Sequence, residues 1–157
     1  NRGKPDKSKK SQRLFQFSLG KSCYIQTLGF GDWYFKDHET YVFSRTGVKI
    51  ESPRTRHVDG DPVAFVRTLK ATRGKNIWLL GGGELNWLFL NHNLIDEIML
   101  SVQPICLGSG IGLFGGRRTD AAINFKLAGS KPFLNGAILL HYKRGDTIPA
   151  EANGGEQ

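Results

Sequence analysis

Three consecutive glycines, residues 81–83, stand between an unbroken apolar run at residues 77–80 (IWLL) and a segment with helical periodicity. A short continuous apolar run is typical of a strand that is buried on both faces of a sheet. Leu85, Leu88 and Phe89 recur at spacings of three and four residues, which predicts a helix directly after the glycines. Glycines at this junction leave backbone N–H groups open to an anion at the positive end of the helix dipole.

The glycine segment matches neither of the two common nucleotide-binding patterns. It lacks the G-x-G-x-x-G spacing of dinucleotide-binding folds and the G-x-x-x-x-G-K-[ST] spacing of P-loop proteins. On the residues alone, a tight turn and a phosphate cradle are therefore equal alternatives for residues 81–83.

A second loop with anion-binding chemistry follows a β-branched and aromatic run (TYVF) that predicts a strand. Ser44, Arg45 and Thr46 combine two hydroxyls with a guanidinium, which suits a phosphate monoester, whereas solvated loop residues are the alternative. Because open α/β sheets bind ligands at strand ends, two such loops in one small chain strengthen the prediction of a ligand site. Two further arginines are candidate supports for this loop: Arg54 and Arg56.

The order of predicted elements is that of an α/β protein with a mixed, mostly parallel central sheet and flanking helices. Asp61 is an N-cap residue and Pro62 occupies the first helical position, so a helix is expected to begin there. The glycine-linked strand and helix are followed by a predicted strand at residues 97–102. Two strands joined by a crossover helix are expected to run parallel in one sheet.

The C-terminal part of the chain predicts an antiparallel pair of strands. Residues 123–127 alternate between apolar and polar side chains, and residues 134–142 contain an apolar run (AILL). Asn135 and Gly136 favour a turn before that run. The predicted sheet is therefore mixed.

The charge of the chain is unevenly distributed along the sequence. The whole sequence has 157 residues and a formal net charge of +8. Residues 1–13 carry six basic residues against one acidic residue, and residues 145–157 carry three acidic residues and no basic one. Such composition favours solvated tails over a nucleic-acid-binding arm. We expect a basic disordered arm at 1–13, a folded domain at 14–144 and a flexible tail at 145–157.

Cysteine and histidine spacing excludes the common disulfide and metal frameworks. Cys23 and Cys106 are far apart in the sequence, and the four histidines show no ligand spacing, so no metal site is expected. Cys106 lies in an apolar run and is expected to be buried. No apolar run approaches the length of a membrane span, and we expect a cytoplasmic protein in a reducing environment.

The longest informative motif is GGGELNWLFLNHNLIDEIMLSVQPICLGSGIGLF, residues 81–114. It resembles the signature of the dihydrofolate reductase-like superfamily, in the branch of the C-terminal reductase domain of the riboflavin-biosynthesis protein. The similarity continues through DPVAFVRTLK, GDWYFKDHETYVFSRT and SKPFLNGAILLHYKR, so that it covers residues 19–144.

This resemblance implies an NADPH site at the strand ends. It places the glycine-rich turn at the cofactor pyrophosphate and the Ser-Arg-Thr loop beside the adenosine 2′-phosphate. A third family element, Gly-Arg-x-Thr at a helix start, is present in altered form, with lysine for arginine and cysteine for threonine. The implied cofactor-binding residues are Gly20, Lys21, Ser22, Ser44, Arg45, Thr46, Gly81, Gly82, Gly83, Glu84 and Leu85.

The start of the chain departs from the family pattern. The resemblance implies an N-terminal strand and a Ser-Leu-Asp-Gly-type motif upstream of Gly20, and this sequence contains neither. The family position of the proton donor falls in that region, so no catalytic residue is assigned and turnover is expected to be weak or absent. A missing strand would expose sheet edges, which favours a homodimer.

The function that these observations favour is an NADPH-dependent reductase that passes hydride to a small heterocyclic or carbonyl substrate. The alternative is a non-catalytic nucleotide-binding or oligomerising remnant of the same family. Nucleic-acid binding by the basic arm is a third hypothesis, and no membrane partner is expected.

Overall fold

The computed structural model describes residues 16–50, 52–116 and 122–145. The chain divides into two compact units, Asn1–Gly82 and Gly83–Gln157. The predicted arm at residues 1–13 and all but the first residue of the predicted tail lie outside the described residues. None of the described helices is long and apolar enough to cross a membrane.

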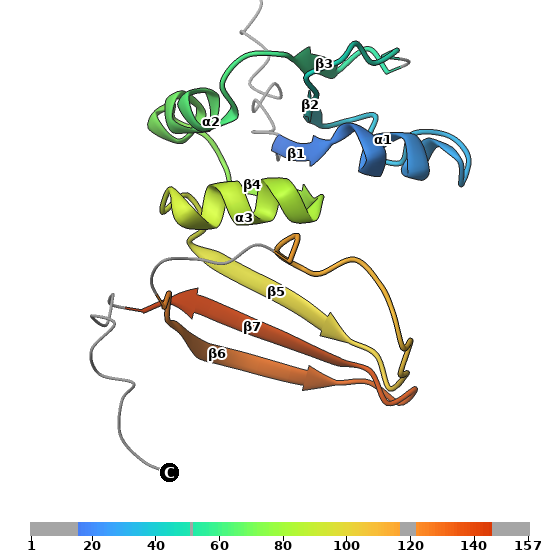
Figure 1. Cartoon of the computed structure of the whole chain (residues 1–157), viewed down its shortest axis with the longest axis vertical. Coiled ribbons are helices and arrows are strands. Elements are labelled where there is room, and N and C mark those ends of the chain that lie inside the picture. The colour runs from blue at the N-terminus through green and yellow to red at the C-terminus, as the bar shows by residue number, and fades with distance from the viewer. Residues whose placement is uncertain (1–15, 51, 117–121, 146–157) are drawn as a thin grey trace, which may run out of the picture. The chain divides into compact units, whose positions relative to one another are not determined.

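The first unit is built on a parallel four-stranded sheet, here called sheet A (Figure 1). Its strand order is β3-β2-β1-β4. The elements in chain order are β1 (Gln16–Gly20), α1 (Lys21–Leu28), β2 (Glu39–Phe43), β3 (Thr55–Val58), α2 (Pro62–Ala71) and β4 (Ile77–Gly81).

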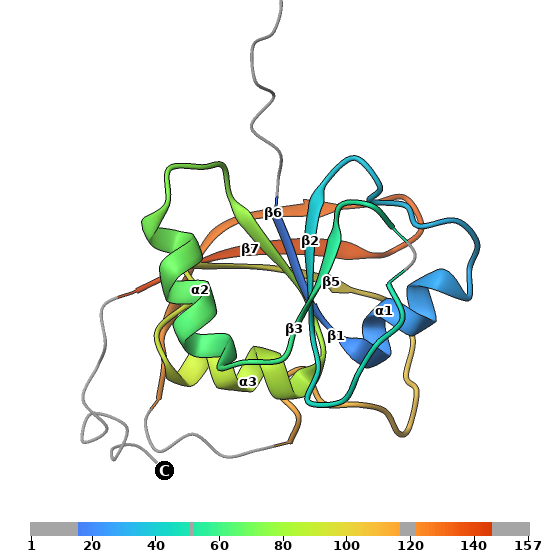
Figure 2. The ribbon, with the colours of Figure 1, turned by 90° about the horizontal axis from the view of Figure 1, so that it is seen from above.

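The two helices of this unit cover opposite faces of sheet A (Figure 2). Successive side chains of a strand point to opposite faces, and β2 uses both of its faces for packing. Val42 is fully buried in a cluster with Tyr24 of α1. Tyr41 and Phe43 make edge-to-face contacts with Phe65 of α2, at centroid distances of 4.9 and 5.7 Å. The central strand β2 is therefore held between two helices.

The second unit contains one helix and an antiparallel three-stranded sheet, here called sheet B, of order β5-β7-β6. Its elements are α3 (Gly83–Asn91), β5 (Glu97–Val102), β6 (Phe125–Pro132) and β7 (Ile138–Arg144). The β6–β7 turn contains Gly136 at φ +83°, and the Asn135 side chain accepts a hydrogen bond from the Ala137 amide at 3.1 Å. The predicted Asn-Gly turn is confirmed.

The crossover prediction is wrong, because strands β4 and β5 belong to different sheets. β4 pairs with β1, and β5 pairs with β7. The right-handed crossover rule applies only when both strands join one sheet, so the helix between them does not impose a parallel pair. β4 is also an edge strand of sheet A, and Trp78 is 51% exposed. The expectation that this strand is buried on both faces is therefore wrong.

The strand β1 was not predicted, since the segment before Gly20 carries only a short apolar pattern. It supplies a partner for both β2 and β4. The absence of a further family strand upstream stays a prediction.

The start of α2 allows a test of local stability. The Asp61 carboxylate accepts a hydrogen bond from the Val63 amide at 2.9 Å, and Pro62 follows it. We expect Asp61→Ala to lower the free energy of unfolding by about 1 kcal/mol, because the helix loses its N-cap acceptor. Asp59→Ala, at an exposed neighbouring carboxylate, serves as the control, and urea denaturation measures both. Equal effects for the two variants would contradict the cap assignment.

Candidate functional site

The carboxyl ends of β2, β1 and β4 lie side by side at one edge of sheet A. The parallel register pairs Gly20 with Phe43 and Leu19 with Gly81. The residues that follow these strands are therefore neighbours in space, although they are far apart in the sequence. Six of the predicted cofactor-binding residues follow or end β1 and β2: Gly20, Lys21, Ser22, Ser44, Arg45 and Thr46.

The loop after β2, residues 44–47, is folded by its own polar groups. The Ser44 hydroxyl donates to the Thr46 carbonyl and accepts from the Thr46 amide at 3.1 Å. Its backbone is also tied to β3, since the Ser44 amide donates to the Val58 carbonyl at 3.2 Å. His57 Nε2 lies 2.9 Å from the Ser44 carbonyl oxygen and donates to it.

The same loop is tied to the start of α1 by Lys21. The Lys21 ammonium donates to the Thr46 hydroxyl at 3.0 Å and to the Gly47 carbonyl at 2.8 Å. None of these contacts among the described residues uses the guanidinium of Arg45, which is exposed. Contacts from β3 and from α1 thus hold the loop on two sides, and Arg45 is an exposed cationic side chain of this loop.

The amino end of α1 adds donors to this edge. Gly20 is the N-cap residue and provides no side-chain acceptor for the first turn of the helix. The first N–H groups of a helix lack intrahelical partners, so they remain available to an anion. Ser22, the second helical residue, is exposed.

The glycine-rich segment passes from one unit to the other. Gly81 ends β4 with φ +99° and Gly82 follows with φ +96°, a backbone region that other residues rarely adopt. No atom lies within 4 Å of the position that a Cβ of Gly82 would take. This open space at the sheet edge is compatible with the close approach of a phosphate.

The third glycine has a packing role. A Cβ on Gly83 would lie 2.6 Å from the Gly115 nitrogen and 2.7 Å from the Gly112 oxygen, so no side chain fits. Gly83, Glu84 and Leu85 form the first turn of α3 in the second unit. In the sequence they follow Gly81, the last residue of β4, with Gly82 between.

Arg54 and Arg56 do not support the Ser-Arg-Thr loop, contrary to the sequence-based expectation. The register of β2 and β3 pairs Arg56 with Tyr41, about 10 Å along the strand from Ser44, and Arg54 precedes β3. Arg56 lies 3.8 Å from the Glu39 carboxylate, and Arg54 Nη1 donates to the Asp37 carbonyl at 3.4 Å. Both arginines therefore belong to the opposite end of the sheet.

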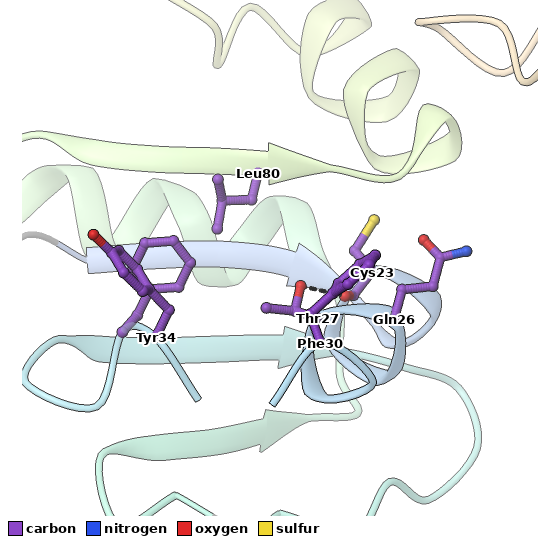
Figure 3. Close-up of a pocket in the computed structure, with 7 residues that line it drawn as sticks. Cys23, Gln26, Thr27, Phe30, Tyr34 and Leu80 are labelled. Carbon is purple, nitrogen blue, oxygen red and sulfur yellow. Dashed lines mark hydrogen bonds between the residues drawn. The ribbon is translucent and has the colours of Figure 1, made fainter. Parts of the chain in front are cut away.

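An apolar pocket of about 440 Å³ lies on the α1 face of sheet A (Figure 3). Cys23 is two residues beyond Lys21 and Leu80 is one residue before Gly81, so this pocket adjoins the strand-end loops. Its volume is in the range of small-molecule sites. The lining residues are Cys23, Gln26, Thr27, Phe30, Tyr34, Phe35 and Leu80.

Cys23 is the half-buried thiol of this pocket. Burial raises the pKa of the Cys23 thiol above its ordinary value, so it stays protonated at neutral pH. Its carbonyl accepts a hydrogen bond from the Thr27 hydroxyl at 2.8 Å. Cys106 was expected to be buried, but it is exposed, as are its apolar neighbours Ile105 and Leu107. This apolar run follows the end of β5 and belongs to no helix or strand, so no periodic face directs it into a core.

Sequence reasoning missed two parts of this site. His57 stands in a β-branched strand without any motif, and only the pairing of β2 with β3 brings it to Ser44. The pocket residues Phe30 and Tyr34 come from the connection after α1, where no periodic signal marks them.

Residues 32–139 match the family of the RibD C-terminal domain. Over 110 residues the chain is 34% identical to the uncharacterized protein YwjB of Bacillus subtilis. This alignment covers 70% of the chain and 62% of YwjB, so the chain spans less than two thirds of that relative's length.

Solved structures show the same fold. A protein described as a riboflavin biosynthesis protein, from Shewanella sp. PV-4, has a TM-score of 0.73 at 24% identity, covering 91% of this chain and 84% of that chain. Dihydrofolate reductase from Enterococcus faecalis, in complex with NADP(H) and RAB-propyl, has a TM-score of 0.61 at 13% identity, covering 85% and 77%. The dihydrofolate reductase-like α/β fold is therefore confirmed.

The two cysteines are expected to differ in reactivity. The thiolate attacks iodoacetamide and displaces iodide, and the raised pKa and partial burial of Cys23 both slow this reaction. At pH 8 we expect Cys106 to be alkylated at least about tenfold faster than Cys23. The Cys23 rate should continue to rise as the pH rises through 9, because its thiolate fraction is still increasing there.

Mass spectrometry of the alkylated peptides measures both rates. Cys106→Ser should remove the fast phase and Cys23→Ser should leave it. A fast phase that is lost in Cys23→Ser would show that the pocket thiol is the accessible one.

Proposed function

The chain belongs to the RibD C-terminal domain family of reductase-type proteins, and we propose that it binds NADPH at the sheet A edge and acts as a reductase. The proposed reaction passes hydride from the nicotinamide to a small heterocyclic or carbonyl substrate. The observation that carries this proposal is the loop at residues 44–47, which hydrogen bonds hold in place and which carries the exposed Arg45 at the sheet edge where β1 and β2 end.

The residues at this edge have the chemistry that NADPH requires. Arg45 is an exposed guanidinium with hydroxyl neighbours, and it would hold the adenosine 2′-phosphate. Gly81 and Gly82 leave backbone and open space for the pyrophosphate. Gly83, Glu84 and Leu85 follow them in the chain as the start of α3, and the backbone N–H groups of a helix start have the chemistry that binds a phosphate. The bound cofactor would supply the hydride, while the protein would orient it.

The apolar pocket is the proposed substrate side of the site. Phe30, Tyr34 and Phe35 offer aromatic surfaces on which a planar ring can pack, and the exposed Gln26 amide can recognise polar ring atoms. This set supports a heterocycle more than an aliphatic aldehyde.

Proton donation is the weak part of the proposed enzyme. The described pocket lining contains no carboxylate. Efficient hydride transfer to a C=N or C=O group needs a positioned proton donor. The lining offers the Cys23 thiol and the Tyr34 phenol, which are weaker acids than a carboxyl group, so we expect slow turnover. The alternative function, a non-catalytic nucleotide-binding protein of the same family, rests on this same feature of the pocket.

Cofactor oxidation separates the two functions. The loss of absorbance at 340 nm is followed with a panel of pterins, flavin precursors and aldehydes. Substrate-dependent oxidation supports the reductase, whereas tight NADPH binding without oxidation by any member of the panel supports the non-catalytic alternative.

The sharpest test of the cofactor site is its preference for the 2′-phosphate. We expect Arg45→Ala to weaken NADPH binding by roughly ten- to a hundredfold, because a charge-assisted hydrogen bond contributes about 1.5 to 3 kcal/mol. NADH lacks the 2′-phosphate, and its affinity should change less than about twofold. Titration calorimetry measures both cofactors.

Arg67→Ala is the matched control, since Arg67 is exposed on α2 and its loss lowers the net charge equally. Its affinity for either cofactor should remain that of the parent. Equal losses of NADPH and NADH in Arg45→Ala would remove the 2′-phosphate assignment, and no binding by the parent chain would remove the cofactor proposal.

We also propose a homodimer, because both sheets have apolar edges. The two free cysteines support a reducing, cytoplasmic environment. β4 and β5 each lie at an edge, and neither strand contains lysine or proline, the residues that usually protect edges. Trp78 is 51% and Met99 is 62% exposed. Light scattering at micromolar concentration should therefore give twice the chain mass, and a stable monomer across this range would contradict the proposal.

A further inference from the structure

We propose that Lys21 is a positioning residue, which holds the loop after β2 so that Arg45 is presented to a 2′-phosphate. This inference rests on the proposed cofactor site and assigns Lys21 a part in the preference of that site for NADPH over NADH. Lys21 would act through the loop and not as the phosphate ligand itself.

The contacts of the Lys21 ammonium carry the proposal. It donates to the Thr46 hydroxyl at 3.0 Å and to the Gly47 carbonyl at 2.8 Å. These two acceptors directly follow Arg45, and Lys21 is the first residue of α1. One side chain therefore joins the end of β1 to the loop after β2.

The other contacts of the loop act on its first half. His57 donates to the Ser44 carbonyl, and the Ser44 amide donates to β3. Lys21, which directly follows β1 as the first residue of α1, and His57 of β3 thus hold the loop on either side of Arg45. Among the hydrogen bonds of the described residues, loss of Lys21 would leave Thr46 with its contacts to Ser44, which lie within the loop.

The geometry favours positioning over direct charge attraction. An ammonium has three N–H donors, and the loop engages two of them. The guanidinium of Arg45 is not used in these contacts and has the planar fork that suits a phosphate. Loss of Lys21 should therefore act mainly by letting Arg45 leave its productive orientation.

The first experiment measures the loop without any cofactor. Amide hydrogen exchange is followed at Ser44 and Thr46, whose N–H groups are hydrogen-bonded in the structure. We expect Lys21→Met to speed exchange at the Thr46 amide about tenfold, while the Ser44 amide, which β3 holds, changes little. Lys21→Arg, which keeps N–H donors, should restore slow exchange at Thr46. Lys36→Met, which removes an exposed charge from the same unit, is the control. Unchanged exchange in Lys21→Met would overturn the proposal.

The second experiment is a double-mutant cycle read by NADPH and NADH affinity. Lys21→Met should weaken NADPH about tenfold and NADH less than about twofold. In the Arg45→Ala background, Lys21→Met should have little further effect, because the group that it positions is gone. An equal further loss of NADPH affinity in that background would show that Lys21 binds phosphate independently and would overturn the positioning role.

The two experiments separate the failure of this inference from the failure of the proposed function. If the parent chain binds neither cofactor, the proposed function and the selective role fall together. Faster exchange in Lys21→Met would then still show that Lys21 holds the loop. If the parent binds NADPH and Lys21→Met binds it equally well, only the inference about Lys21 is wrong.

Discussion

Parallel hydrogen bonding of β1 with both β2 and β4 is the constraint on which the candidate site depends. Parallel strands end at the same edge of a sheet, so the loops that follow them must meet there. Lys21, Arg45 and Gly82 are separated by 24 and 37 residues in the sequence, yet each stands one or two residues after one of these strand ends. The interior strand β1 therefore brings the loops after β2 and β4 to one edge of sheet A, and it also pairs the two strands into one sheet.

The strand-end loop after β2 shows how a small domain can present one cation. Its polar side chains and backbone satisfy one another, and contacts from α1 and β3 hold it on both sides. Ordering the loop before a ligand arrives reduces the entropy that binding must overcome. Arg45 is an exposed side chain of this loop, and the contacts that hold the loop do not use its guanidinium.

The accuracy of the sequence-based predictions depended on the range of the interaction. The start of α2 at Pro62 and the turn at Gly136 were predicted because caps and turns are encoded within a few residues. The pairing of β4 was not predicted, since its partner β1 lies about 60 residues earlier and has a short, weak pattern. His57 was missed for the same reason, because its contact with Ser44 exists only through strand pairing.

The sequence by itself determined the α/β class, the family resemblance and the residue types at the candidate site. These properties depend on local periodicity and on motifs that are read along the chain. Only the tertiary structure decided that Lys21 and Arg45 have different surroundings, that Gly83 is required by the packing of Gly115, and that Arg54 and Arg56 lie at the other end of the sheet. Those assignments depend on strand register and on backbone approach, which are set by contacts between distant segments and leave no local pattern.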